Sequence, residues 1–136
     1  MRRSAVEAAE RWRPDLDGSV SVRDPSDPDR ELVLDYVRSH LRDPDLCHAS
    51  VAAAHHMSPR SLNRLFEGEV RSVTETIRSL RLDAIRAELL DPRWRRNPVI
   101  VVASRWGFRE QAHFTRAFKA EFGNTPAAMR RRAFLV

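Results

Sequence analysis

Apolar residues recur at helical spacing in several segments of this chain, and prolines, glycines and capping residues separate the segments. The first helix is predicted to begin near Pro28, since proline suits the first helical turn and Asp27 is a good N-cap. A short apolar segment, 51–54, follows, and Ser58 then caps another helix. The apolar face of that helix comprises Leu62, Leu65 and Phe66. Two short helices separated by about three residues are typical of a helix-turn-helix unit.

A longer helix is predicted for residues 72–91. Ser72 and Glu75 have the spacing of a capping box, and Pro92 prevents the helix from continuing. At about 1.5 Å per residue, the residues between the Ser72 cap and Asp91 form a helix about 27 Å long. It would act as a stiff spacer between the segments on its two sides.

The four residues 99–102 are all β-branched, which by itself favours a strand. The context favours a helix, because Asn97 is a candidate N-cap and Pro98 suits the first helical turn. A helix over residues 109–122 is then predicted from phenylalanines that repeat every four residues, and a short last helix begins at Thr125. The second half of the chain thus repeats the helix-turn-helix pattern of the first.

These elements predict an all-α fold of two helix-turn-helix subdomains joined by a long linking helix. We assign residues 1–28 to a flexible N-terminal segment or linker remnant and 29–71 to the first subdomain. Residues 72–91 form the linking helix and 92–136 the second subdomain. The chain has only 4 glycines and 7% aromatic residues, which also favours helices over a β-sandwich.

The charge distribution points to a polyanionic partner. The net charge is +5, and residues 99–136 alone carry seven Arg and Lys against two Glu. Nearly all of this charge is arginine, whose planar fork of donors fits phosphate and the guanine edge. The alternative is an arginine-rich soluble protein without such a partner, and charge alone does not separate the two.

Other functional classes find little support. Cys47 is the only cysteine, so an intrachain disulfide is excluded, and no apolar run reaches the length of a membrane span. We therefore expect a cytoplasmic protein. We find no paired nucleophile and base, no glycine-rich phosphate loop and no set of metal ligands, since His55 and His56 are adjacent and point apart. No enzymatic activity, metal or cofactor is expected, and both histidines are interpreted as turn and surface residues.

Two longer motifs carry a more specific signal. The second unit contains Trp106-Gly107-Phe108, the run 114–119, the run 122–126 and Arg130. The first unit contains Met57-Ser58-Pro59-Arg60, then Leu62 and Arg64-Leu65-Phe66, and the linking helix contains Arg81-Leu82. With these motifs the chain resembles the AraC/XylS family of bacterial transcription regulators over about residues 30–132. The resemblance implies homeodomain-like three-helix units and a DNA-binding transcription factor.

Two positions depart from the family pattern. The turn residue before Met57 is often glycine in the family but is His56 here, which must adopt a left-handed conformation at some cost. The family tends to have alternating polar residues in the helix that begins near Val99, whereas Ile100 and Val101 are apolar here. We expect these two side chains to be exposed and available to a partner.

The second helix of each unit is expected to enter a major groove. The outward residues predicted for the first unit are Arg60, Ser61, Asn63 and Arg64. The outward residues predicted for the second unit are Arg109, Gln111, Ala112, His113, Thr115 and Arg116. The resemblance favours base contacts for most of them, while Arg109 and Thr115 are more typical of phosphate contacts. The alternative is a solvated polar face without a partner.

The predicted function is sequence-specific binding of double-stranded DNA by a transcription regulator whose monomer contacts two successive major grooves. The alternative is a basic helical module that docks on RNA polymerase or on a sensor domain. Family members commonly carry a separate effector-binding or dimerisation domain, for which we expect no room in residues 1–28. The chain is therefore expected to be either a stand-alone short regulator or the C-terminal part of a longer protein with an N-terminal effector-binding domain. Such a domain and RNA polymerase are therefore weighed as further partners beside DNA.

Overall fold

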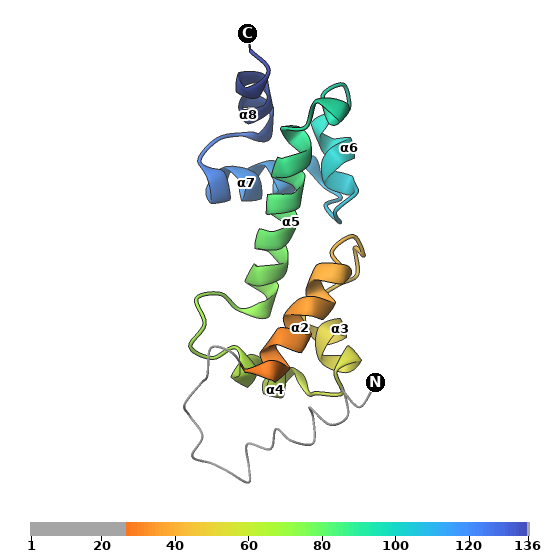
Figure 1. Cartoon of the computed structure of the whole chain (residues 1–136), viewed down its shortest axis with the longest axis vertical. Coiled ribbons are helices and arrows are strands. Elements are labelled where there is room, and N and C mark those ends of the chain that lie inside the picture. Colours follow the sequence, from red (N-terminus) through yellow and green to blue (C-terminus); the bar gives the residue numbers. More distant parts are fainter. Residues whose placement is uncertain (1–26, 136) are drawn as a thin grey trace. The chain divides into compact units, whose positions relative to one another are not determined.

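The structure, a computed structural model, describes residues 27–135, and all regular elements in this range are helices. They are α2 (Pro28–Ser39), α3 (His48–Ala54), α4 (Pro59–Leu65), α5 (Val73–Leu89), the 3₁₀ helix η1 (Pro92–Trp94), α6 (Val99–Ser104), α7 (Gln111–Phe122) and α8 (Pro126–Ala133) (Figure 1). The predicted all-α class is confirmed for these residues. The prediction for residues 1–28 lies, apart from its last two positions, outside the described range.

The described residues divide into two compact units. The first contains residues 27–40 and 46–77, and the second contains residues 41–45 and 78–135. Helix α5 therefore begins in the first unit and ends in the second. The short segment 41–45 belongs to the second unit although helices of the first unit flank it in the chain.

Local capping determines where most of the helices begin. The Asp27 carboxylate accepts a hydrogen bond from the Asp29 amide at 2.9 Å, and the Thr125 hydroxyl accepts one from the Ala128 amide at 3.1 Å. The capping box predicted at the start of α5 is confirmed. The Ser72 amide donates to the Glu75 carboxylate at 3.0 Å, and the Glu75 amide donates to the Ser72 hydroxyl at 3.1 Å.

The N-cap predicted for α6 is wrong. Pro98, rather than Asn97, is the N-cap residue, with φ −57° and ψ 146°, and no side chain caps this helix. The Pro98 carbonyl instead accepts hydrogen bonds from the amides of Val101 at 3.0 Å and Val102 at 3.2 Å. Proline can occupy this position because a residue at the N-cap has no need to donate an amide hydrogen bond.

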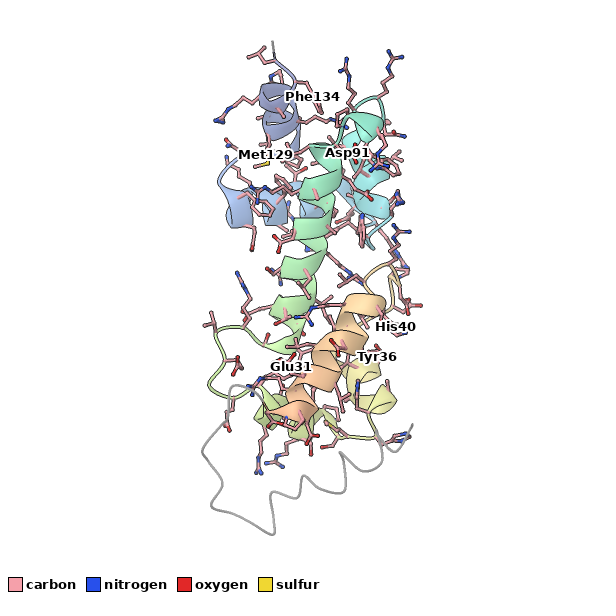
Figure 2. All side chains as sticks on the ribbon, viewed as in Figure 1. Glu31, Tyr36, His40, Asp91, Met129 and Phe134 are labelled. Atoms are coloured by element: carbon pink, nitrogen blue, oxygen red, sulfur yellow. The ribbon has the colours of Figure 1, made fainter. Side chains whose placement is uncertain are left out.

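The core of the first unit is made by α2, α3, α4 and the start of α5. Its largest fully buried side chains are Val33, Val37, Val51, Leu62 and Leu65. An aromatic group packs beside it, in which the Tyr36 ring stacks on His40 at 3.9 Å between centroids (Figure 2).

His55 belongs to the same aromatic group. Its ring meets the edge of Tyr36 at 5.1 Å, and its Nδ1 lies 3.0 Å from the Val51 carbonyl oxygen. The expectation that His55 is a surface residue is therefore wrong, because only 7% of it is exposed.

The core of the second unit lies where α5, α6 and α7 pack together (Figure 1). Its members, contributed by all three helices and the turn before α7, are Leu82, Ile85, Leu89, Val102, Ala103, Phe108, Phe114 and Phe118. The burial of Val102 and Ala103 explains why the β-branched run forms a helix. Tertiary packing of one helical face outweighs the modest strand preference of such residues.

The two apolar residues at the start of α6 differ in exposure. Val101 is 41% exposed, as expected, whereas Ile100 is half-buried against the core of the second unit. The expectation of an exposed Ile100 is therefore wrong. In the part of the chain that the structure describes, no helix combines the length and the apolar character needed to cross a bilayer.

Candidate nucleic-acid interface

The first helix-turn-helix consists of α3, a tight turn and α4. The turn is closed by a hydrogen bond of 2.9 Å from the Met57 amide to the Ala52 carbonyl oxygen. His56 adopts the expected left-handed conformation, with φ +56°, and is the sole non-glycine residue with positive φ among the residues described. Ser58 then caps α4, because its hydroxyl accepts a hydrogen bond from the Ser61 amide at 3.0 Å.

Helix α4 has one buried face and one exposed face. Leu62 and Leu65 are fully buried, whereas Arg60, Asn63 and Arg64 are exposed. Ser61 is half-buried, and its hydroxyl accepts a hydrogen bond of 3.1 Å from the Ser58 hydroxyl. The exposed set thus comprises two guanidinium groups and one carboxamide, which suit guanine and adenine edges respectively.

The second helix-turn-helix consists of α6, a turn at Gly107 and α7. Gly107 has φ +94°, and the Phe108 amide donates to the Ala103 carbonyl oxygen at 3.3 Å. Phe108 is the first of a series of packed rings, with centroid distances of 5.2 Å to Phe114 and 5.7 Å from Phe114 to Phe118. This series holds the inner face of α7 against the core.

The outer face of α7 presents the predicted residues. Gln111, Ala112, His113 and Arg116 are exposed, whereas Thr115 is half-buried. The His113 ring leans against Phe108 at 5.9 Å between centroids. Arg109, in the turn, lies 3.9 Å from the Asp45 carboxylate, but both side chains are largely exposed, so this ion pair contributes little to stability.

Arg81 holds the segment 41–45 from within the second unit. Its Nε donates to the Leu41 carbonyl oxygen at 2.9 Å, and its Nη2 donates to the Asp43 carbonyl oxygen at 2.6 Å. Burial lowers the pKa of Arg81, and the nearby charge of Asp43 partly offsets this by raising it. In the same segment, the Arg42 guanidinium stacks over the Trp106 ring at 4.7 Å from the centroid.

The sequence did not predict which side chains contact the turn between α6 and α7. Arg81 and Trp106 enter the sequence prediction only as members of motifs. Glu88, which contacts Trp106, received no role because its partner lies 18 positions away in the chain. A motif shows that such residues occur together but does not show which side chains they contact.

Comparisons with known proteins agree on one kind of domain. A family model described as a helix-turn-helix domain matches residues 51–132. The regulatory protein HrpB of Ralstonia nicotianae is 28% identical over 91% of this chain and 25% of its own length. The transcriptional activator NphR of a Rhodococcus species is 33% identical over 70% of this chain and 28% of its own length. The chain thus spans roughly a quarter of the length of these curated relatives.

Solved structures give the same result for the fold. The C-terminal domain of AraT, a response regulator from Geobacillus stearothermophilus, superimposes with a TM-score of 0.69 at 25% identity, over 82% of this chain and 88% of that one. A transcriptional regulator with an AraC-type DNA-binding domain from Chromobacterium violaceum gives a TM-score of 0.70 at 22% identity, over 81% and 96% of the two chains. The second likeness concerns the fold alone.

Proposed function

The chain belongs to the AraC/XylS family of helix-turn-helix transcription regulators, and from this premise we propose that it binds double-stranded DNA sequence-specifically to regulate transcription. The observation that carries the proposal is the duplicated unit. In each half, a second helix buries one face and exposes arginine together with a carboxamide side chain. The matched relatives are regulators rather than enzymes, so a catalytic role has no support from them.

We assign α4 as the recognition helix of the first unit. Arg60 and Arg64 suit the two acceptors of guanine, and Asn63 suits the donor and acceptor pair of adenine. Ser61 is proposed to contribute less to base recognition, since its hydroxyl already accepts a hydrogen bond from the Ser58 hydroxyl at the start of α4. All four lie in the first two turns of the helix, the part that enters the major groove in helix-turn-helix proteins.

We assign α7 as the recognition helix of the second unit. Gln111, His113 and Arg116 supply hydrogen-bonding groups for base edges, and Ala112 supplies a methyl group for contact with thymine. Arg109 and Thr115 are proposed to contact phosphates, which position the protein without specifying sequence. The exposed Arg109 is better suited to this role than the half-buried Thr115.

In the bound state we propose that the monomer reads two successive major grooves, whose centres are about 34 Å apart. The division into a subdomain 29–71, a linking helix 72–91 and a subdomain 92–136 is part of this proposal. The 17 residues of α5 alone span about 26 Å, which is the right order for a spacer between two recognition helices.

The whole regulator is proposed to have further partners. The greater length of the relatives is consistent with an effector-binding domain besides the DNA-binding one. RNA polymerase would be the target through which bound protein alters transcription. Because its proposed ligand is DNA, we propose the bacterial cytoplasm as the site of action.

Selection from a pool of random duplexes tests this function directly. The expected motif has two blocks about 10 base pairs apart. Affinity should fall by about 10³ or more between 50 and 200 mM salt if six or more phosphates are contacted. The variants R64A and R116A should each lose preference in one block while remaining folded. Salt-sensitive binding without a motif, unchanged in both variants, would instead support a basic protein-docking module.

A further inference from the structure

The carboxylate of Glu88, near the end of α5, binds two consecutive residues at the turn before α7. The Trp106 indole Nε1 donates to Glu88 Oε1 at 3.1 Å, and the Arg105 Nη2 donates to Glu88 Oε2 at 3.3 Å. Only 16% of the Glu88 side chain and 27% of the Arg105 side chain are exposed. Hydrogen bonds to an ionised carboxylate are stronger than those between neutral groups. The Glu88 carboxylate is also shielded from most of the solvent, which strengthens them further.

Two tryptophan rings, each stacked against an arginine, lie beside this carboxylate contact. The Arg105 guanidinium lies 4.3 Å from the centroid of the Trp94 ring, and Arg42 lies 4.7 Å from that of Trp106. The Trp94 carbonyl oxygen in turn accepts a hydrogen bond of 3.1 Å from Arg130 of α8. Glu88 is therefore the central acceptor of a group that joins α5, η1, α6 and α8. We call Glu88, Trp94, Arg105 and Trp106 the Glu88 cluster.

The Glu88 cluster adjoins the residues that set the direction of α7. Arg105 is the C-cap of α6, Gly107 makes the turn, and α7 begins at Gln111. Arg81 lies seven residues before Glu88 on α5, a spacing that places both on one face of a helix. The Arg81 guanidinium is adjacent to Gly107, so α5 contacts this turn through both side chains.

We infer that Glu88 is a positioning residue for the second recognition helix: by holding Arg105 and Trp106 it sets the orientation of α7 and thereby the base preference of this helix. The inference rests on the proposed function for its DNA-binding consequence. Glu88 itself bonds to Arg105 and Trp106, and only 16% of its side chain is exposed. Its effect on DNA must therefore act through Trp106 and the turn.

The test uses three variants and a matched control in the full chain. Glu88→Ala removes both acceptors, Glu88→Gln keeps an acceptor for Trp106 but removes the charge that pairs with Arg105, and Trp106→Phe removes the donor while keeping a ring. Asp83→Ala, at an exposed position of the same helix, is the control. Each variant is first compared with the parent chain by circular dichroism and thermal unfolding.

Binding is then measured on the selected two-block duplex and on duplexes with one block scrambled. We expect Glu88→Ala to weaken binding to the intact duplex by about tenfold, the order of one lost charged hydrogen bond. The loss should disappear when the block read by α7 is scrambled and persist when the other block is scrambled. Trp106→Phe should show the same pattern, and the double variant should be no weaker than Glu88→Ala, because Glu88→Ala already removes the bond to Trp106. Equal losses on all duplexes, or none relative to Asp83→Ala, would overturn the inference.

A readout without DNA separates this inference from the proposed function. In amide spectra, Glu88→Ala and Trp106→Phe should both shift the signals of residues 111–116, and Glu88→Ala should also expose the Trp106 indole N–H to exchange. Glu88→Gln should keep the indole protected and produce smaller shifts. Shifts confined to residues near the substitution would overturn the positioning role even if the chain selects a motif. Shifts that reach α7 in a chain that selects no motif would instead contradict only the proposed function.

Discussion

Gly107 faces the guanidinium of Arg81 so closely that a Cβ atom on Gly107 would lie 3.0 Å from Arg81 Cζ. The glycine also has φ +94°, a conformation that other residues rarely adopt. Backbone geometry therefore favours glycine at this turn, and a Cβ there would also force the Arg81 guanidinium to shift by a few tenths of an ångström. Gly68 differs, because it has φ +88° but no atom within 4 Å of its Cβ position.

Substitution of the two glycines separates the effect of positive φ, which both have, from the effect of the close contact with Arg81, which Gly107 alone has. We expect Gly68→Ala to lower the free energy of unfolding by about 1 kcal/mol, the cost of a left-handed non-glycine residue. Gly107→Ala should cost about 1–3 kcal/mol more, because the Arg81 side chain must move. Urea denaturation of both variants measures the difference. Equal losses would show that the contact with Arg81 contributes nothing.

His56 carries the same strain in the first turn. With φ +56° it takes a left-handed conformation that non-glycine residues adopt only at some cost. We expect His56→Gly to raise the stability by about 0.5–1 kcal/mol and His56→Val to lower it by a larger amount, since a β-branched residue tolerates this conformation poorly. Thermal unfolding measures both. A destabilising His56→Gly would mean that the imidazole makes contacts worth more than the strain.

Arg81 cannot be replaced by lysine without loss. Its Nε and Nη2 donate to two different carbonyl oxygens, at Leu41 and Asp43, and a single ammonium group cannot copy this fork. We expect Arg81→Lys to cost about 1–2 kcal/mol and Arg81→Ala about 2–4 kcal/mol. Arg78→Ala, at an exposed position of the same helix, is the control and should change the denaturation midpoint little.

The two recognition helices should act on different blocks of the operator. Asn63→Ala should relax adenine preference in the block read by α4, and Gln111→Ala should do so in the block read by α7. Each loss should amount to about 1–3 kcal/mol against the correct base. Each variant serves as the control for the other in competition binding with single-base substitutions. Loss of preference in both blocks from one substitution would contradict the assignment of separate helices.

The stability of the segment around Asp91 and η1 is expected to depend on pH. Hydrogen bonds from the Arg93 side chain and then from the Arg93 amide lower the pKa of this carboxyl group, and the amide bond also caps η1. Because the pKa of Asp91 is lower in the folded chain, ionised Asp91 stabilises the fold at pH values above its unfolded pKa of about 3.9. The contribution is lost as the pH falls through the folded value. In a carboxyl NMR titration, Arg93→Ala should raise the Asp91 pKa only partly, because the amide bond remains.

Sequence predicted the local features of this fold well. The caps at Asp27, Ser58 and Ser72 were all predicted, because each depends on residues two or three positions away in the chain. The inward faces of α4 and α7 also follow from helical periodicity. Asn97 failed as a cap because the backbone of Pro98 occupies the N-cap position instead.

The tertiary structure alone decided which distant residues meet. Arg81 reaches the carbonyl oxygen of Leu41 across 40 positions, and Trp106 reaches Glu88 across 18. The local sequence pattern does not identify such partners. An arginine or glutamate on the polar face of a helix occupies the same position in the pattern whether water or a distant residue binds it. Capping and periodicity are determined by the chain within a few residues, whereas these contacts form only when tertiary packing brings the partners together and partly shields them from water.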